Sequence, residues 1–76
     1  SKDGRWAIVY NGELYNDPEL RAELRRTGHE PDCESDTATV CQVLSAWGSR
    51  GLEQCRGMFA LAAFDTQEQK LVLARP

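Results

Sequence analysis

The 76-residue sequence predicts a small α+β protein in which helices pack on an antiparallel sheet. Three observations predict this fold class. A run rich in β-branched and aromatic side chains occupies residues 6–10. Two segments with helical spacing of apolar residues follow it, and two further apolar runs fill the last third of the chain. The predicted order is therefore β-α-α-β-β, with a C-terminal antiparallel hairpin.

The first strand, residues 6–10, is expected to be buried and to end at a turn. Asn11 and Gly12 follow it directly, and this pair is a strong turn signal because both residues tolerate positive φ. A helix is then expected to begin with Asp17 as its N-cap and Pro18 at its first helical position.

The first helix has one apolar and one polar face. Leu20 and Leu24 are spaced by one helical turn and are expected to face the core, whereas Arg21 is expected on the solvent side. Gly28 is expected to end this helix in the left-handed conformation, which glycine adopts at the least cost. The polar residues 29–34 predict a loop.

The second helix is expected to begin near Ser35 and Asp36. Either residue could cap the first backbone N–H groups of the helix, and the helix dipole favours a carboxylate there. An amphipathic stripe with the spacing i, i+3, i+4, i+7 follows, and it consists of Val40, Val43, Leu44 and Trp47.

After the second helix the chain is expected to return as two strands. Residues 58–64 form a continuous apolar run, which is typical of a strand buried on both faces. Residues 65–70 are a polar connection, and residues 71–74 are expected to form the last strand. The short connection between the two runs predicts the antiparallel hairpin.

The composition argues against several classes of protein. The chain holds 9 Lys and Arg against 12 Asp and Glu, with a formal net charge of −3, so no nucleic-acid partner is expected. The longest apolar run is far shorter than the roughly 20 residues that span a bilayer, so no membrane partner is expected. No secretory signal is visible at the start of the sequence, and we expect a cytoplasmic protein.

The cysteines do not follow a disulfide or metal pattern. Cys33, Cys41 and Cys55 are odd in number and lack the close pairs of zinc sites, and the lone His29 adds no second ligand. We therefore expect free thiols in a reducing compartment and no metal. A redox or metal-binding role is an alternative to which the spacing gives little support.

Two places along the chain could carry chemistry. The Asn11 side-chain amide and the Gly12 backbone N–H could donate to an oxyanion, and Glu13 could receive a cationic amine. The alternative is that Asn11 and Gly12 serve only the turn. Asp36 could likewise dock a substrate ammonium group or serve only as a helix cap. The residues by themselves leave both alternatives open.

Several short segments together resemble a known family. They are NGELYN at 11–16, ELRAEL at 19–24, GH at 28–29, SDT at 35–37, WG at 47–48, RGMFA at 56–60 and LAR at 73–75. Their succession resembles the glutamine amidotransferase domain of asparagine synthetases, of the class II or N-terminal-nucleophile type. The resemblance covers nearly the whole chain, so residues 1–76 are expected to be a single partial domain of that type.

The resemblance implies a fragment of an αββα sandwich. In this family an N-terminal cysteine attacks the side-chain amide of L-glutamine, and the ammonia passes to a synthetase domain that uses ATP and magnesium. By position, Asn11 and Gly12 match the oxyanion-hole pair, and Glu13 and Asp36 match residues that hold the α-amino end of glutamine. No cofactor is implied for this chain, because ATP and magnesium belong to the synthetase domain of the parent enzyme.

The sequence also departs from the family. The nucleophile and the arginine that holds the glutamine carboxylate lie upstream in the family, and Ser1 does not match the nucleophile. Ala38 stands where the family has glutamate, which removes a reciprocal capping-box contact. We therefore expect this chain to be cut from a larger glutamine-hydrolysing asparagine synthetase and to be inactive alone.

A second hypothesis is a non-catalytic truncated module that folds by self-association. A chain of this size buries only roughly 60% of the surface that its unfolded form exposes, so its core is marginal. Unpaired strand edges also recruit other chains. This hypothesis predicts a homodimer or a domain-swapped oligomer.

Overall fold

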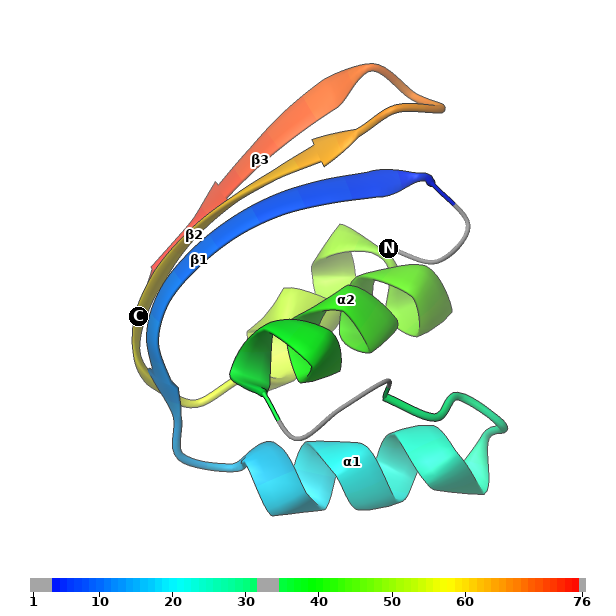
Figure 1. Cartoon of the computed structure of the whole chain (residues 1–76), viewed down its shortest axis with the longest axis vertical. Coiled ribbons are helices and arrows are strands. Elements are labelled where there is room, and N and C mark those ends of the chain that lie inside the picture. The colour runs from blue at the N-terminus through cyan, green and yellow to red at the C-terminus, as the bar shows by residue number, and fades with distance from the viewer. Residues whose placement is uncertain (1–3, 32–34, 76) are drawn as a thin grey trace.

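The structure, a computed structural model, describes residues 4–31 and 35–75. Its elements are β1 (Trp6–Leu14), α1 (Asp17–Arg26), α2 (Asp36–Trp47), a 3₁₀ helix η1 (Ser49–Gln54), β2 (Gly57–Asp65) and β3 (Lys70–Ala74). The predicted α+β class and the order β-α-α-β-β are confirmed, with η1 added between α2 and β2. Figure 1 shows two layers, a curved sheet and the helices α1 and α2 on its concave side.

The sheet has three strands in the order β1-β2-β3, and both neighbouring pairs are antiparallel. β2 is the central strand and pairs with β1 along the whole length of both. The predicted C-terminal hairpin is confirmed, because β2 and β3 pair from Asp65 opposite Lys70 to Leu61 opposite Ala74.

The predicted turn at Asn11 and Gly12 is wrong, because β1 continues through both residues. Asn11 lies opposite Ala60 and Gly12 lies opposite Phe59 in the register with β2. Pairing with the central strand gives the backbone N–H and C=O groups of this segment hydrogen-bond partners in the sheet, whereas a turn would leave them to water. The sheet therefore overrides the local preference of the Asn-Gly pair for a turn. The chain reverses only after Leu14, directly before α1.

The start of α1 also differs from the prediction. Asn16, not Asp17, is the N-cap residue, and its side chain makes no cap hydrogen bond. The Asn16 amide is engaged elsewhere: Nδ2 donates to the Gln54 carbonyl at 2.7 Å, and Oδ1 accepts the Arg56 backbone N–H at 2.9 Å. Pro18 lies in the first turn of α1, but it is the second helical residue and not the first, because the helix begins at Asp17.

The end of α1 is as predicted. Gly28 has a φ of +87°. Its N–H donates to the Arg25 carbonyl at 3.1 Å, and the His29 N–H donates to the Leu24 carbonyl at 2.8 Å. These two bonds form a Schellman motif, in which glycine takes the left-handed conformation just beyond the helix.

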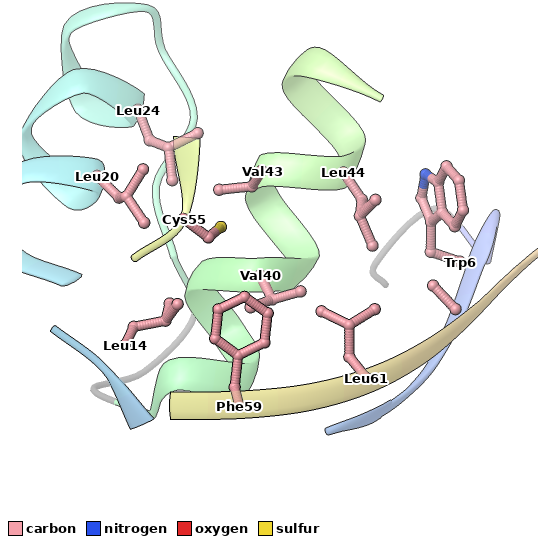
Figure 2. Packing of buried hydrophobic residues seen from close by; sticks show 11 residues of the cluster. Trp6, Leu14, Leu20, Leu24, Val40, Val43, Leu44, Cys55, Phe59 and Leu61 are labelled. Carbon is pink, nitrogen blue, oxygen red and sulfur yellow. The ribbon is translucent and has the colours of Figure 1, made fainter. Parts of the chain in front are cut away.

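α2 begins at the predicted place and contributes Val40, Val43 and Leu44 to the core. Ser35 is its N-cap, and Ser35 Oγ accepts the Ala38 backbone N–H at 3.2 Å. Figure 2 shows the buried side chains of α2 facing Phe59 and Leu61 of β2, with those of α1 to one side. The core cluster consists of Trp6, Leu14, Leu20, Leu24, Val40, Val43, Leu44, Cys55, Phe59, Leu61 and Ala63.

The sheet is covered on one face only within the described residues. This corrects the prediction that residues 58–64 are buried on both faces, and residues 6–10, predicted as a buried strand, are buried on one face only. Burial alternates along β2, so that Phe59 faces the helices whereas Met58 is 67% exposed. Burial alternates along β1 in the same way. The reason is that α1 and α2 lie on the same side of the sheet (Figure 1). We call the other side the outer sheet face, and its exposed apolar residues are Val9, Met58, Phe64, Leu71 and Leu73.

Among the described residues, no helix is long and apolar enough to cross a membrane. Residues 4–31 and 35–75 contain no group of three or more His, Cys, Asp and Glu side chains that could hold a metal ion. Cys55 carries a free thiol. Cys33 and Ser1 lie outside the described residues.

Candidate functional site

The four residues singled out from the sequence lie at the end of β1 and the start of α2. Asn11, Gly12 and Glu13 are consecutive in the strand, and Asp36 is the first residue of the helix. The Leu14 backbone N–H donates to Oδ2 of Asp36 at 2.8 Å. This bond joins residues 22 positions apart in the sequence, so the fold brings Asp36 beside the strand that carries the other three.

Asn11 and Glu13 lie on the outer sheet face. Both are exposed, and they alternate along β1 with the half-buried Tyr10 and the buried Leu14, whose side chains belong to the opposite face. In the part of the chain that the structure describes, neither Asn11 nor Glu13 makes a side-chain hydrogen bond or ion pair. Their polar groups are therefore free to meet a ligand.

Gly12 is required by close packing against β2. Its φ is +122°, and a Cβ atom at this position would lie 2.2 Å from the Met58 carbonyl oxygen. Both features favour glycine, because other residues carry a Cβ and rarely adopt this φ. The glycine that the family resemblance assigns to the oxyanion pair thus has a structural role in the sheet as well.

Tyr10 is a residue of this region that the sequence did not single out. Its hydroxyl is buried and has no hydrogen-bond partner among residues 4–31 and 35–75. Burial is the largest cause that raises the pKa of Tyr10 to about 12, and the negative charge of Asp36 is the next. The ring stacks on Phe59, with centroids 6.0 Å apart. The alternation of side chains from Trp6 onward would have indicated that Tyr10 faces inward.

The surroundings of Tyr10 are acidic. The carboxylates of Asp36, Asp17 and Glu13 each raise the pKa of the Tyr10 hydroxyl, because they disfavour a further negative charge. The same negative potential favours a cationic group at the end of β1.

Arg21 is buried, which corrects its predicted place on the solvent side; it is only 4% exposed. Its Nε donates to Asp17 Oδ2 at 2.7 Å, and its Nη2 donates to the Ser35 carbonyl oxygen at 2.8 Å. The Thr39 hydroxyl donates to the other carboxylate oxygen of Asp17. The spacing i, i+4 of Asp17 and Arg21 is the signal that could have indicated their pairing.

A cleft of about 660 Å³ lies elsewhere on the molecule, between α1 and η1 and beside Trp47. None of the four site residues proposed from the sequence lines it. Within the described residues, the candidate site is thus an open surface at the end of β1, formed by one strand and one helix start.

Comparison with known families identifies the class of this chain. The sequence profile of a family described as a glutamine amidotransferase domain matches residues 1–76. The chain belongs to this family, and the resemblance seen in its short segments is confirmed.

The chain is similar to several asparagine synthetases. It is 38% identical over 74 residues to glutamine-hydrolyzing asparagine synthetase 3 of Bacillus subtilis strain 168, a match that covers 97% of this chain and 12% of that protein. Glutamine-hydrolyzing asparagine synthetase 1 of the same strain is 32% identical over 74 residues, with the same coverage of 97% and 12%. The Zea mays enzyme is 29% identical over 75 residues, which cover 99% of this chain and 12% of that protein. This chain therefore spans a small part of the relatives it matches.

Proposed function

We propose that this chain is the part of a glutamine amidotransferase domain that binds L-glutamine, in a parent enzyme that releases ammonia for amide synthesis. The observation that carries the proposal is the bond from the Leu14 N–H to Asp36, because it joins a carboxylate to the strand that bears Asn11 and Glu13. Membership of the family over residues 1–76 supports the substrate class. The names of the similar synthetases also include glutamine hydrolysis.

Each residue has one role in this proposal. The Asn11 side-chain amide and the Gly12 N–H donate to the oxyanion that forms when the side-chain amide of glutamine is attacked. Glu13 and Asp36 accept hydrogen bonds from the α-ammonium group. Because Oδ2 of Asp36 accepts the Leu14 N–H, Oδ1 is the oxygen available to that ammonium group.

We propose further that the chain alone does not hydrolyse glutamine. No residue of the chain matches the nucleophile of the family, and a nucleophile acts as a unit with the groups that assist it. The chain covers 12% of its relatives, so the nucleophile, ATP and magnesium belong to other parts of the parent. We propose that this chain needs no cofactor of its own, and the free thiol of Cys55 suits a reducing cytoplasm.

Binding is tested by titrating the isotope-labelled chain with L-glutamine and following its amide signals. We expect the amides of residues 11–14 to shift together with a Kd in the millimolar range or weaker, about −4 kcal/mol, because part of the ligand contacts are missing. Asp36→Asn should weaken binding on the order of tenfold. Glu19→Gln, which changes an exposed acid on α1, is the matched control and should leave binding unchanged. No shift at residues 11–14, or equal effects of both variants, contradicts the proposal.

Activity is tested by a coupled assay of ammonia release from glutamine. We expect the chain to give no release above background. Release that Asn11→Ala abolishes would contradict the proposed inactivity, because loss of an oxyanion donor lowers kcat by about 10²–10³.

The exposed apolar side chains of the outer sheet face favour a second layer of structure over this face in the parent domain. Val9, Leu71 and Leu73 are 74%, 64% and 72% exposed there. We propose that a second sheet covers them, as in an αββα sandwich, because stacked sheets bury facing apolar side chains at a spacing of about 10 Å. Asn11 and Glu13 lie on the same face, so such a sheet would also cover these two residues, whereas Asp36 begins α2 on the helix side.

A second candidate function is a non-catalytic module that pairs with a second copy of itself. The outer sheet face favours it, since two identical sheets related by a two-fold axis bury the same apolar side chains on both copies. Light scattering at micromolar concentration tests this candidate. Self-association predicts a dimer that Leu73→Lys converts to a monomer, whereas the control Glu53→Lys on η1 stays dimeric. A monomeric wild-type chain with a sharp melting transition contradicts it.

A further inference from the structure

A polar network lies between α1 and α2 and consists of Asp17, Arg21, Ser35 and Thr39. We propose that Arg21 is a positioning residue for Asp36, which holds the peptide unit from which Asp36 extends and so keeps its carboxylate at the end of β1. The role of Asp36 toward a glutamine ammonium group rests on the proposed function. The link from Arg21 to Asp36 is a separate claim about the structure.

The link from Arg21 to Asp36 runs through the peptide unit that joins Ser35 to Asp36. The carbonyl oxygen of Ser35 and the backbone nitrogen of Asp36 belong to the same rigid plane. Arg21 Nη2 donates to that oxygen at 2.8 Å. A bond at the oxygen restricts rotation of the whole plane, and hence the direction in which the Asp36 side chain leaves the backbone.

The other end of the link is the bond between Asp36 and β1. Asp36 Oδ2 accepts the Leu14 N–H at 2.8 Å. Figure 1 shows that α1 and α2 both begin on the side of the molecule where β1 ends. Arg21 and Leu14 therefore act on Asp36 from two elements, the first through its backbone and the second through its carboxylate.

Arginine suits this position better than lysine does. Its planar guanidinium donates in two fixed directions, here to Asp17 through Nε and to Ser35 through Nη2. The second carboxylate oxygen of Asp17 accepts from Thr39 of α2, so the anion that orients Arg21 is itself held by the helix that Asp36 begins. A lysine ammonium group is a point charge and cannot reproduce this fork.

The burial of Arg21 also argues for a role in position rather than in stability. Arg21 is 4% exposed, and a buried ion pair is weak support for stability because its desolvation offsets the attraction of the charges. Arg25 offers a contrast on the same helix, since it is exposed and pairs with Glu30 at the surface. A change at Arg25 removes an ion pair from α1 without touching the start of α2.

The experiment measures amide hydrogen exchange of the full chain at two positions. Leu14 reports the bond to Asp36, and Ala63 reports global stability because it lies in the central strand opposite both Ile8 and Val72. We expect Arg21→Lys to lower the protection of Leu14 relative to Ala63 on the order of tenfold. Arg25→Lys should leave that ratio unchanged to within about twofold.

Two outcomes overturn the proposal. The first is an unchanged Leu14 to Ala63 ratio in Arg21→Lys, and the second is an equal loss at both amides, which is what a purely structural role produces. If Arg21→Lys does not fold, Asp17→Asn is the variant that tests the proposal, because it keeps the side-chain volume and releases Arg21 from its ion pair. It should lower the ratio by about threefold or more, and an unchanged ratio overturns the proposal.

A glutamine titration of the same variants separates this proposal from the proposed function. Weaker binding in Arg21→Lys, together with a lower Leu14 to Ala63 ratio, supports both. If the wild-type chain shows no glutamine-dependent shift while the ratio still falls in Arg21→Lys, the proposed function fails and the positioning role of Arg21 stands.

Discussion

A Cβ atom on Gly12 would lie 2.2 Å from the carbonyl oxygen of Met58, across the pairing of β1 with β2. Gly12 also has a φ of +122°. Close approach to the partner strand and an unusual backbone conformation thus fall on one residue. In the sequence Gly12 looks like the second residue of an Asn-Gly turn. In the structure a glycine is needed there because β1 packs closely against β2.

Gly12→Ala is expected to lower the free energy of unfolding by about 3 kcal/mol, because the added methyl group combines overpacking with backbone strain. Gly28→Ala is the matched control. It also has a positive φ, but its Cβ meets nothing within 4 Å, so only backbone strain of about 1 kcal/mol is expected. Urea unfolding followed by circular dichroism measures both. Equal losses would show that the contact with Met58 is not the cause.

Tyr10→Phe is expected to stabilise the protein by about 1 kcal/mol, because it removes a buried hydroxyl that has no partner among the described residues. The control Tyr15→Phe changes a tyrosine that is 64% exposed and should have no effect. Chemical unfolding at neutral pH measures the difference. A clear loss of stability in Tyr10→Phe would mean that the hydroxyl makes a stabilising bond.

The raised pKa of the Tyr10 hydroxyl predicts that the protein loses stability in alkali. The folded protein raises the pKa of Tyr10 to about 12 from its usual 10.0, mainly through burial. The folded state therefore keeps a proton that the unfolded state releases, and stability falls as pH rises from about 10 toward 12. Thermal melting over this range should show a steeper fall for the wild type than for Tyr10→Phe. Parallel curves would contradict the expectation.

The lowered pKa of the Asp65 carboxyl predicts that the protein loses stability in acid. Arg5 donates two hydrogen bonds to its carboxylate, from Nε at 3.0 Å and Nη2 at 2.8 Å. These bonds are the largest cause that lowers the pKa of Asp65 to about 2 from its usual 3.8. A carboxyl with a lowered pKa stabilises the fold above its unfolded pKa, and this contribution is lost as pH falls through the folded value.

The difference in Tm between the wild type and Asp65→Asn should therefore be largest above about pH 4 and shrink toward about pH 2. Glu19→Gln changes an exposed acid whose side chain makes no hydrogen bond or ion pair with the described residues, and it should give a small difference at every pH. A Tm difference for Asp65→Asn that does not change with pH would mean that Arg5 and Asp65 are not paired in solution.

Cys55 is expected to be the slower of the two described thiols toward maleimide. Burial raises the pKa of the Cys55 thiol, and the nucleophile is the thiolate. Cys41 is only half-buried. Peptide mapping by mass spectrometry should find Cys55 modified at least about tenfold more slowly in the native chain, with the difference lost in urea. Equal native rates would contradict the burial of Cys55.

Local signals determined the helices well. The start of α2 near Ser35 and Asp36, the glycine end of α1 at Gly28 and the apolar stripe of α2 were all predicted correctly, because each depends on contacts within one or two helical turns. Which of the two residues caps α2 was left open by the sequence, and the structure shows that it is Ser35. The C-terminal hairpin was predicted for the same reason, since a short polar connection joins its two strands. The identities of the candidate site residues also came from short motifs of the chain.

Long-range contacts decided the rest. Asn11 and Gly12 stay extended because β2, nearly fifty positions away by its register, engages them. Arg21 is buried because the start of α2 receives its guanidinium. The outer sheet face is open because both helices lie on the other side. None of these partners lies within a helical turn of the residue it affects.

The sequence by itself determined the family, the element order and the residues that we propose for glutamine binding. Only the tertiary structure decided that Asp36 accepts the Leu14 N–H and that Gly12 lies against Met58. It also decided that Arg21 donates to the Ser35 carbonyl oxygen at the start of α2. The physical reason is one of distance. Caps and periodic stripes depend on neighbours along the chain, whereas these hydrogen bonds and close contacts depend on groups that only folding brings within reach.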